Sequence, residues 1–163
     1  MVKVKEIMTL NPKACTPTTD LAEAAHVMWN SDCGILPVVT GGGRVVGLIT
    51  DRDICMAAAM KGRTLANIAV EEVINGKVYS CKPKDNVITA LEIMRDRRVR
   101  RLPVVSDEGL LEGMISMNDI VLLARPSGKK TELSYGEAIK TYQAICAHDA
   151  PTLQEIDSMA ASI

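Results

Sequence analysis

The amino-acid sequence predicts an α+β domain made of two related strand–helix–strand–strand–helix units that pack through their sheets, followed by a helical tail. The main observation is an internal repeat: residues 4–60 and 70–126 match without a gap when the chain is shifted by 66 positions (Pro103 minus Pro37). Each copy also combines apolar residues at helical spacing with short β-branched runs. A unit that cannot bury its apolar face alone packs against its copy, which gives one domain with two related crevices.

The composition suits one compact domain with a tail. The chain has 163 residues, of which 47% are hydrophobic, but it has no Phe and only 2% aromatic residues. The core must therefore consist of Val, Ile, Leu, Met and Ala. The formal charge of −1 argues against a general nucleic-acid binder. Residues 1–5 lack the apolar core of a signal peptide and no stretch reaches membrane-spanning length, so we expect a cytoplasmic protein that does not bind membranes.

The cysteines are expected to be reduced, buried thiols. The five cysteines, at positions 15, 33, 55, 81 and 146, include no C-x-x-C pair. Neither His26 nor His148 belongs to a Cys/His cluster with the spacing of a metal site. We therefore predict no disulfide and no metal site.

Each copy is predicted to begin with a strand, which is followed by an amphipathic helix. In the first copy, Asp20 caps a helix whose apolar residues Leu21, Ala24, Ala25 and Met28 fall at i, i+3, i+4 and i+7. In the second copy an asparagine takes the capping position and a matching apolar stripe follows. This spacing predicts one buried helix face in each half.

A hairpin and a second helix complete each copy. The β-branched run at residues 35–39 predicts a buried strand, and the glycines at residues 41–43 predict a turn before a strand at residues 45–50. The final helices are predicted to open at Asp51 and Met117. Each copy therefore ends on a strand that runs directly into a helix.

The last helix of the second copy is apolar on every side between Ile120 and Ala124. A helix of this kind must be covered on every side. We therefore expect part of its cover to come from a second subunit. Trp29, beside the apolar stripe of the first helix, supports the same expectation of a homodimer.

The segment after the repeats has no counterpart within them. Residues 125–130 indicate a linker, and apolar residues at helical spacing predict a helix from Ser134 to His148, which Pro151 ends. A short terminal helix up to Ser162 is a further candidate, and we expect the tail to close the domain or the dimer. The predicted division is 2–62 for the first repeat, 63–69 for a linker, 70–126 for the second repeat and 127–163 for the tail.

The pattern with the most chemical content is a Gly, two apolar residues, a hydroxyl residue, two variable positions and an Asp. It occurs at residues 47–53 and again at residues 113–119. The Asp lies in the first turn of a helix whose cap is the hydroxyl residue, so one interpretation is a capping box. The other is a ligand site, because helix starts favour anions and a carboxylate suits the two hydroxyls of a ribose. The glycines, where backbone must approach a neighbour closely, favour the second interpretation.

The tandem repeat, this motif and the Leu-Pro-Val-Val run at residues 36–39 and 102–105 together resemble a pair of CBS domains, the Bateman module. The resemblance covers about residues 2–126. It implies a disc-like, pseudo-twofold domain that is usually dimeric and has no catalytic activity. It also implies clefts between the repeats that bind adenosine-containing ligands such as AMP, ADP, ATP, S-adenosylmethionine or NAD.

The resemblance further implies the residues of the two clefts, each of which combines the hydroxyl and the Asp of one repeat with two strands of the other. Cleft one would contain Thr50, Asp53, Val78, Tyr79, Arg100, Arg101, Leu102 and Pro103. Cleft two would contain Ser116, Asp119, Lys13, Ala14, Gly34, Ile35, Leu36 and Pro37. Apolar strand residues would enclose the adenine while backbone groups bind its edge.

The two copies differ in charge beside one strand. Arg100 and Arg101 precede the strand of cleft one, whereas the first copy has no cation at the matching place. Arg binds phosphate oxygens bidentately, with about 1.5–3 kcal/mol for each charge-assisted bond. With Arg52 as a third cation, cleft one is expected to prefer phosphorylated ligands, and cleft two, with only Lys13 nearby, to bind more weakly, stay empty or take a less anionic adenosyl ligand. Tyr79 would stack on a base or pack at the domain edge.

These observations give two hypotheses of function. The first is a non-enzymatic regulatory sensor, in which an adenosine-containing ligand changes the shape of the domain or its affinity for an unknown target protein. The second is a dimeric interaction scaffold whose clefts bind nothing. An enzyme is the weakest interpretation, because the sequence has no nucleophile–base pair, no metal-ligand cluster and no phosphate-loop motif. We expect no cofactor.

Overall fold

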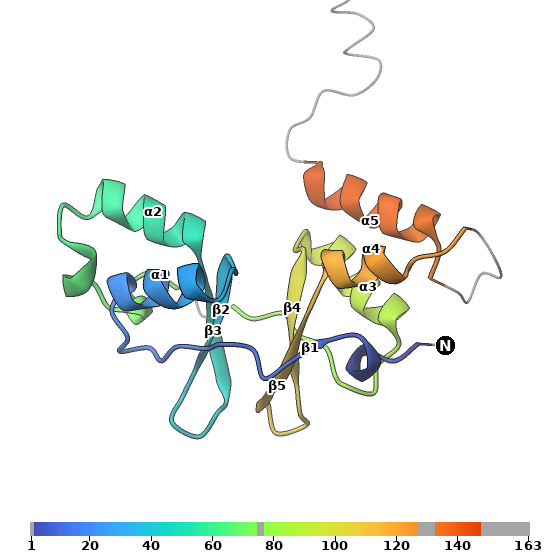
Figure 1. Cartoon of the computed structure of the whole chain (residues 1–163), viewed down its shortest axis with the longest axis horizontal. Coiled ribbons are helices and arrows are strands. Elements are labelled where there is room, and N and C mark those ends of the chain that lie inside the picture. Colours follow the sequence, from blue (N-terminus) through green and yellow to red (C-terminus); the bar gives the residue numbers. More distant parts are fainter. Residues whose placement is uncertain (1, 75–76, 127–132, 148–163) are drawn as a thin grey trace, which may run out of the picture.

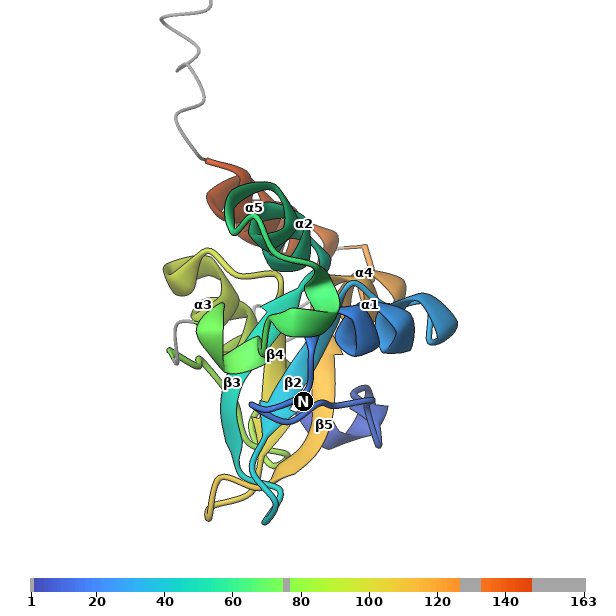
Figure 2. The same ribbon diagram turned by 90° about the vertical axis from the view of Figure 1, so that its left-hand side faces the viewer.

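The computed structural model describes residues 2–74, 77–126 and 133–147, and it shows the two-unit α+β fold that the repeat predicts. Figure 1 shows the two halves side by side, with the strands toward the middle of the molecule and the helices toward the outside. Figure 2, turned by 90°, shows the strands of the two halves one behind the other. The halves therefore meet through their sheets, as expected.

The described elements follow the order of the repeat. The first half contains α1 (Leu21–Asn30), β2 (Ile35–Val39), β3 (Val45–Thr50) and α2 (Asp51–Met60). The second half contains α3 (Val87–Arg97), β4 (Arg101–Val105), β5 (Leu111–Ser116) and α4 (Met117–Leu123). The other elements are the short strand β1 (Thr9–Leu10), the helix α5 (Tyr135–Cys146) and the 3₁₀ turns η1 (Val4–Glu6), η2 (Leu65–Asn67) and η3 (Val70–Glu72).

Helices α1 and α3 begin and end in matching ways. The Asp20 carboxylate accepts a hydrogen bond from the Glu23 amide at 2.8 Å, and the Asn86 side chain accepts one from the amide two residues later at 3.1 Å. The chain leaves both helices through left-handed backbone, at Asp32 (φ 47°) and at Arg98 (φ 53°). The two units therefore share their local geometry as well as their sequence.

Each half carries one antiparallel hairpin, and the two hairpins are joined at their tips. β2 pairs with β3, and β4 pairs with β5. The Val45 amide donates a hydrogen bond to the Gly109 carbonyl at 3.1 Å, and the Leu111 amide donates one to the Gly43 carbonyl at 3.0 Å. These bonds hold the turn ends of the two sheets together.

The strand expected at the start of each repeat is short: the first repeat has the two-residue β1 before α1, and each repeat adds one parallel bridge to its hairpin. Cys15 forms a single parallel bridge with Val38, and Cys81 forms the matching bridge in the second half. Two residues later the chain has Pro17 and Pro83, which lack the N–H group needed to extend a ladder. Each segment is therefore anchored to its hairpin at one residue.

The segment at the start of each repeat completes the core of the other repeat. Val4 is fully buried in the core of the second half, where its amide donates to the Asp85 carbonyl at 3.0 Å. Val70 is fully buried in the core of the first half, where its amide donates to the Thr19 carbonyl at 2.9 Å. Strand β1 continues the first crossing by pairing with β5. Neither half therefore closes its core alone.

Gly47 and Gly113 lie where these crossing segments approach the hairpins most closely. A Cβ atom at Gly47 would lie 2.6 Å from the side chain of Ile74. A Cβ atom at Gly113 would lie 2.6 Å from Met8 Sδ and 2.9 Å from the Thr9 carbonyl oxygen. The close approach predicted at these glycines is therefore made by the protein's own chain.

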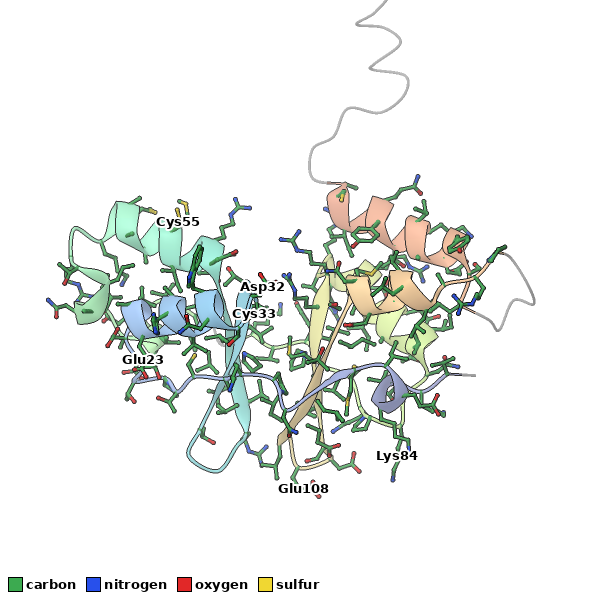
Figure 3. The ribbon with its side chains drawn as sticks, viewed as in Figure 1. Glu23, Asp32, Cys33, Cys55, Lys84 and Glu108 are labelled. Atoms are coloured by element: carbon green, nitrogen blue, oxygen red, sulfur yellow. The ribbon has the colours of Figure 1, made fainter. Side chains whose placement is uncertain are left out.

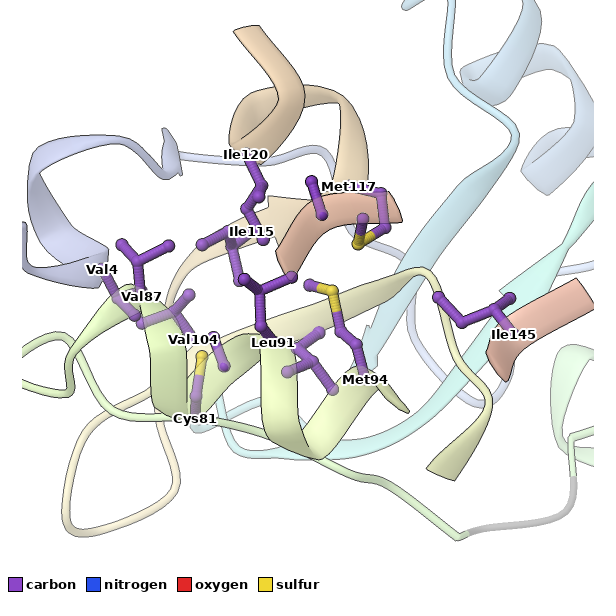
Figure 4. Close-up of a cluster of buried hydrophobic side chains, with 13 residues drawn as sticks. Val4, Cys81, Val87, Leu91, Met94, Val104, Ile115, Met117, Ile120 and Ile145 are labelled. Atoms are coloured by element: carbon purple, nitrogen blue, oxygen red, sulfur yellow. The ribbon is translucent and has the colours of Figure 1, made fainter. Parts of the chain in front are cut away.

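The buried side chains form one cluster in each half. The first cluster consists of Cys15, Leu21, Ala24, Met28, Leu36, Val38, Ile49, Ile54, Ala57, Ile68 and Val70. The second cluster, drawn in Figure 4, consists of Val4, Cys81, Val87, Ala90, Leu91, Met94, Leu102, Val104, Ile115, Met117, Ile120, Ala138 and Ile145. The segment at residues 63–69, expected as a linker, thus supplies Ile68 to the first core.

Helix α5 confirms the predicted helix in the tail. It packs on α3 and α4 and adds Ala138 and Ile145 to the second core. Part of the cover expected for α4 therefore comes from the same chain, although Leu122 remains 79% exposed. The linker at residues 127–130 and the candidate helix up to Ser162 lie outside the described residues. Cover by a second subunit stays a prediction.

The cysteines differ in burial, so the expectation of five buried thiols is wrong in part. Cys15 and Cys81 are buried, Cys33 is half-buried, and Cys55 and Cys146 are exposed. Burial raises the pKa of Cys15 to about 11 and that of Cys81 to about 12. Among the described residues, no group of three His, Cys, Asp or Glu side chains could hold a metal ion, and no helix is long and apolar enough to cross a bilayer.

We predict that Gly113→Ala destabilises the protein more than Gly47→Ala does. The new methyl group would meet a backbone carbonyl at Gly113 but the end of a flexible side chain at Gly47. Overpacking costs about 1–3 kcal/mol, so urea unfolding of Gly113→Ala should lose about 2 kcal/mol or more. Gly41→Ala is the control, because a Cβ atom there has nothing within 4 Å. Wild-type stability of Gly113→Ala would contradict the crossing of β1.

We also predict two classes of thiol. At pH 8 a maleimide should label Cys55 and Cys146 rapidly and should label Cys15 and Cys81 only after unfolding. The raised pKa values have a second consequence, because the unfolded chain loses these two protons first as the pH rises. The free energy of unfolding should therefore fall between about pH 9 and pH 11. A free energy of unfolding that stays constant over this range would contradict the burial of Cys15 and Cys81.

Candidate ligand-binding cleft between the repeats

A cavity of about 390 Å³ lies between the two halves and takes its walls from both. The first half contributes Thr9, Asn11, Pro12, Lys13, Ser31, Asp32, Cys33, Gly34, Ile35 and Pro37. The second half contributes Arg101, Met114, Ile115, Ser116 and Asp119. Figure 3 shows Asp32 and Cys33 near the middle of the molecule, beside β2. This cavity corresponds to the predicted cleft two, and we keep that name.

Strand β2 presents alternate side chains to cleft two. Ile35 and Pro37 line the cavity, whereas Leu36 between them is fully buried in the first core. This alternation is the normal pleat of a strand, so the Leu36 side chain cannot contact a ligand. Lys13 and Gly34 also line the cavity, as predicted, and Ala14 does not.

Ser116 and Asp119 form the capping box at the start of α4. The backbone N–H and the hydroxyl of Ser116 donate to Asp119 Oδ2 at 2.8 and 2.7 Å, and the Asp119 amide points back to Ser116 Oγ at 3.4 Å. The capping interpretation is therefore correct. The second carboxylate oxygen, Oδ1, takes no part in this cap, and both residues line cleft two. The cap and a ligand role are thus compatible.

Thr50 and Asp53 repeat this capping box at the start of α2. The backbone N–H and the hydroxyl of Thr50 donate to Asp53 Oδ2 at 2.9 and 2.7 Å. The glycine argument for a ligand site is wrong in both copies, because Ile74 and Met8 occupy the space beside the glycines. The motif by itself is accounted for by helix capping and by the packing of the crossing segments.

Arg101 lines cleft two, which corrects the expectation that Lys13 is the only cation there. Arg101 opens β4 directly opposite Ser116 at the end of β5, so its position in the sheet brings it to the edge of this cavity. Arg100 and Arg52 are exposed, and neither lines cleft two.

The other residues predicted for cleft one remain a prediction. Leu102 is fully buried in the second core, which excludes its side chain from a ligand. Val78 is half-buried and Pro103 is buried, and neither of them lines cleft two.

The Tyr79 ring favours packing at the domain edge. It rests against the second core, with Lys77 Nζ 5.5 Å and Arg97 Cζ 4.9 Å from the ring centroid. A hydrogen bond from Lys77 and the charges of Lys77 and Arg97 hold the pKa of Tyr79 below its usual value. These contacts support the second of the two roles predicted for this tyrosine.

Several residues of cleft two escaped the sequence analysis. They are Thr9, Asn11, Pro12, Ser31, Asp32, Cys33, Met114 and Ile115. Most of them lie in or just after β1 or just after α1, and neither segment contains the repeated motif. Their place next to Lys13 and Gly34 in the chain is the signal that could have found them.

The fold defines a module of two related units with a cavity between them, and comparison with known proteins identifies its class. The CBS domain model matches residues 4–59 and 70–125. The chain therefore belongs to the CBS domain family and contains a tandem CBS pair.

Relatives support this assignment over most of the chain. CBS domain-containing protein YhcV of Bacillus subtilis (strain 168) is 32% identical over 122 residues, which are 75% of this chain and 85% of that protein. The CBS domain pair of protein MJ0100, solved with 5′-methylthioadenosine and S-adenosyl-L-methionine, is 26% identical with a TM-score of 0.69 and covers 76% of this chain and 95% of that one. The CBS-domain containing protein ATU1752 from Agrobacterium tumefaciens is 27% identical with a TM-score of 0.66 and covers 74% and 98%.

Proposed function

We propose that this protein is a non-enzymatic regulatory module that binds an adenosine-containing ligand in cleft two. The candidate ligands are AMP, ADP, ATP, S-adenosylmethionine and NAD. The observation that carries the proposal is a single cavity with walls from both repeats. A ligand bound there contacts both halves, so its binding energy biases how they pack. The adenosyl ligands of the MJ0100 pair support this chemical class.

The residues of cleft two suit the three parts of such a ligand. Ile35, Pro37 and Met114 offer apolar surface for the adenine. Asp119 keeps Oδ1 outside its cap, where it can accept hydrogen bonds from ribose hydroxyls. Lys13 supplies a cation for a phosphate or carboxylate group. Arg101 supplies a second.

The charge balance of cleft two favours a ligand of small net charge. Its walls hold the cations Lys13 and Arg101 and the carboxylates Asp32 and Asp119. A triphosphate would bring more negative charge than two cations can offset beside two carboxylates. AMP and S-adenosylmethionine are therefore the preferred candidates. Cleft one, with Thr50, Asp53 and Arg100, is proposed as a related second site.

A homodimeric interaction scaffold is the second candidate function. Trp29, Met60 and Leu122 are 85%, 76% and 79% exposed, which is unusual for large apolar side chains. A ligand that binds only the folded state at 100 times its Kd stabilises it by about 2.7 kcal/mol, so a thermal-shift screen with these adenosyl compounds separates the two functions. Light scattering tests the dimer.

We predict that Asp119→Asn weakens AMP or S-adenosylmethionine binding at cleft two, whereas Asp53→Asn affects only the second site proposed in cleft one. Each substitution disturbs the equivalent capping box of its own helix, α2 or α4, so the two variants should lose similar stability. Only Asp119 lines cleft two, and losing a charge-assisted bond to the ribose should lower affinity about tenfold or more in equilibrium dialysis. Wild-type affinity of Asp119→Asn, or a loss confined to Asp53→Asn, would refute cleft two as the site.

We further predict that Arg101→Ala lowers AMP affinity about tenfold while leaving adenosine affinity nearly unchanged, because Arg101 would contact the phosphate. Arg98→Ala is the matched control, since Arg98 is exposed and lies outside the cavity. Isothermal titration calorimetry with both ligands measures the difference. An equal loss for AMP and adenosine would show that Arg101 acts on the fold instead of on the phosphate.

A further inference from the structure

A second cavity, of about 370 Å³, lies between α1 and α2, and we call it the α1–α2 groove. Its walls are Ala25, Met28, Trp29, Asp32, Cys33, Gly34, Asp51 and Ile54. Met28 and Ile54 belong to the first core, so the floor is apolar. Trp29 at the rim is 85% exposed, and it is the only tryptophan of the chain.

The repeat shows what this groove is shaped to hold. A shift of 66 positions turns Ala25, Met28, Asp51 and Ile54 into Leu91, Met94, Met117 and Ile120. These four side chains share the second core with Ala138 and Ile145 of α5. Figure 1 shows α5 lying over α3 and α4. In the second half, therefore, an amphipathic helix occupies the place that the α1–α2 groove leaves open among the described residues of the first half.

The rim of the α1–α2 groove and the matching rim of the surface that α5 covers carry opposite charge. In the second half, Arg95 lies 3.9 Å from Glu137 of α5. The first half has Trp29 where the second has Arg95, and Asp32 where the second has Arg98. Asp51 also replaces an apolar Met at the groove wall. A helix seated here would meet two carboxylates and an aromatic face, both of which attract a cation.

We propose that the α1–α2 groove is a docking site for an amphipathic helix of a partner protein that carries Lys or Arg where α5 carries Glu137. The apolar floor binds the helix stripe, and Trp29, Asp32 and Asp51 bind the cation. The chain's own residues 148–163 have the wrong chemistry, because they contain Asp149, Glu155 and Asp157 and no Lys or Arg. The α5 helix of a second copy has the wrong charge at the decisive position, because it carries Glu137 there.

The groove shares a wall with cleft two. Asp32, Cys33 and Gly34 line both cavities. A ligand that repositions this segment therefore changes the groove, and by linkage the partner helix changes ligand affinity by the same factor. This coupling rests on the proposed function, whereas the docking site does not.

The docking site can be tested on the full-length chain with two synthetic helices. The parent peptide is residues 134–147 with Cys146→Ser, and the cationic peptide adds Glu137→Lys. Neither contains Trp, so the emission of Trp29 reports docking directly. We expect the cationic peptide to shift this emission to the blue and to bind at least about fivefold more tightly than the parent. Equal binding, or no emission change with either peptide, would overturn the proposal.

Three protein variants locate the contact, measured by polarisation of a labelled cationic peptide. Trp29→Ala should lose at least about tenfold in affinity, and it should fold because Trp29 is almost fully exposed. Asp32→Asn should lose about threefold, since Asn tolerates the left-handed backbone at this position and only the charge is removed. Glu23→Gln is the control, because Glu23 is on α1 but lies away from Asp32 and Cys33 in Figure 3. Wild-type affinity of Trp29→Ala would overturn the site.

Two further outcomes would assign the groove to another occupant and so overturn the proposal. Binding of the cationic peptide only after deletion of residues 148–163 would identify the protein's own tail as the occupant. A dimer that Trp29→Ala dissociates and the peptide does not would identify a second copy. Repeating the peptide titration with saturating AMP tests the coupling separately. If AMP leaves the peptide affinity unchanged, the coupling through the shared wall is contradicted and the docking site is not.

Discussion

The reciprocal burial of Val4 and Val70 is the interaction on which the rest of this structure depends. Each of these residues is fully buried in the half to which its own repeat does not belong. The backbone bonds from Val4 to Asp85 and from Val70 to Thr19 fix both crossings at matching points. Because each core is completed by the other repeat, the halves cannot separate without exposing both cores, and their facing edges are held together as a cleft.

This arrangement also explains why the proposed ligand cleft and the proposed docking groove lie so close together. Strand β1 pairs with β5, and the segment that follows β1 brings Lys13 to the same cavity as Ser116 and Asp119. The short segment that follows α1 faces this cleft on one side and the α1–α2 groove on the other. A ligand and a partner bound at these two proposed sites would both contact this segment, which gives a physical route for coupling between them.

Much of the fold and part of cleft two were predictable because they rest on local patterns. Helix spacing, the caps at Asp20 and Asn86 and the turn residues each act over a few positions, so they appear directly in the sequence. The motif around Asp119 was found in the same way, and the structure places it on the cavity wall. The interpretation of the glycines failed because a glycine predicts a close approach without showing whether a ligand or the protein itself approaches. The groups that do approach, Met8 and Ile74, are distant from these glycines in the sequence.

The sequence by itself determined that two equal units exist, where their helices start and which polar residues cap them. Tertiary structure alone decided which core each crossing segment completes and that Arg101 lines cleft two. It also decided that α5 packs on α3 and α4, whereas the equivalent α1–α2 groove is open among the described residues. The physical reason is the range of the forces involved. Capping and periodicity act between near neighbours, whereas the burial of a segment depends on whichever apolar surface it meets after the chain has folded.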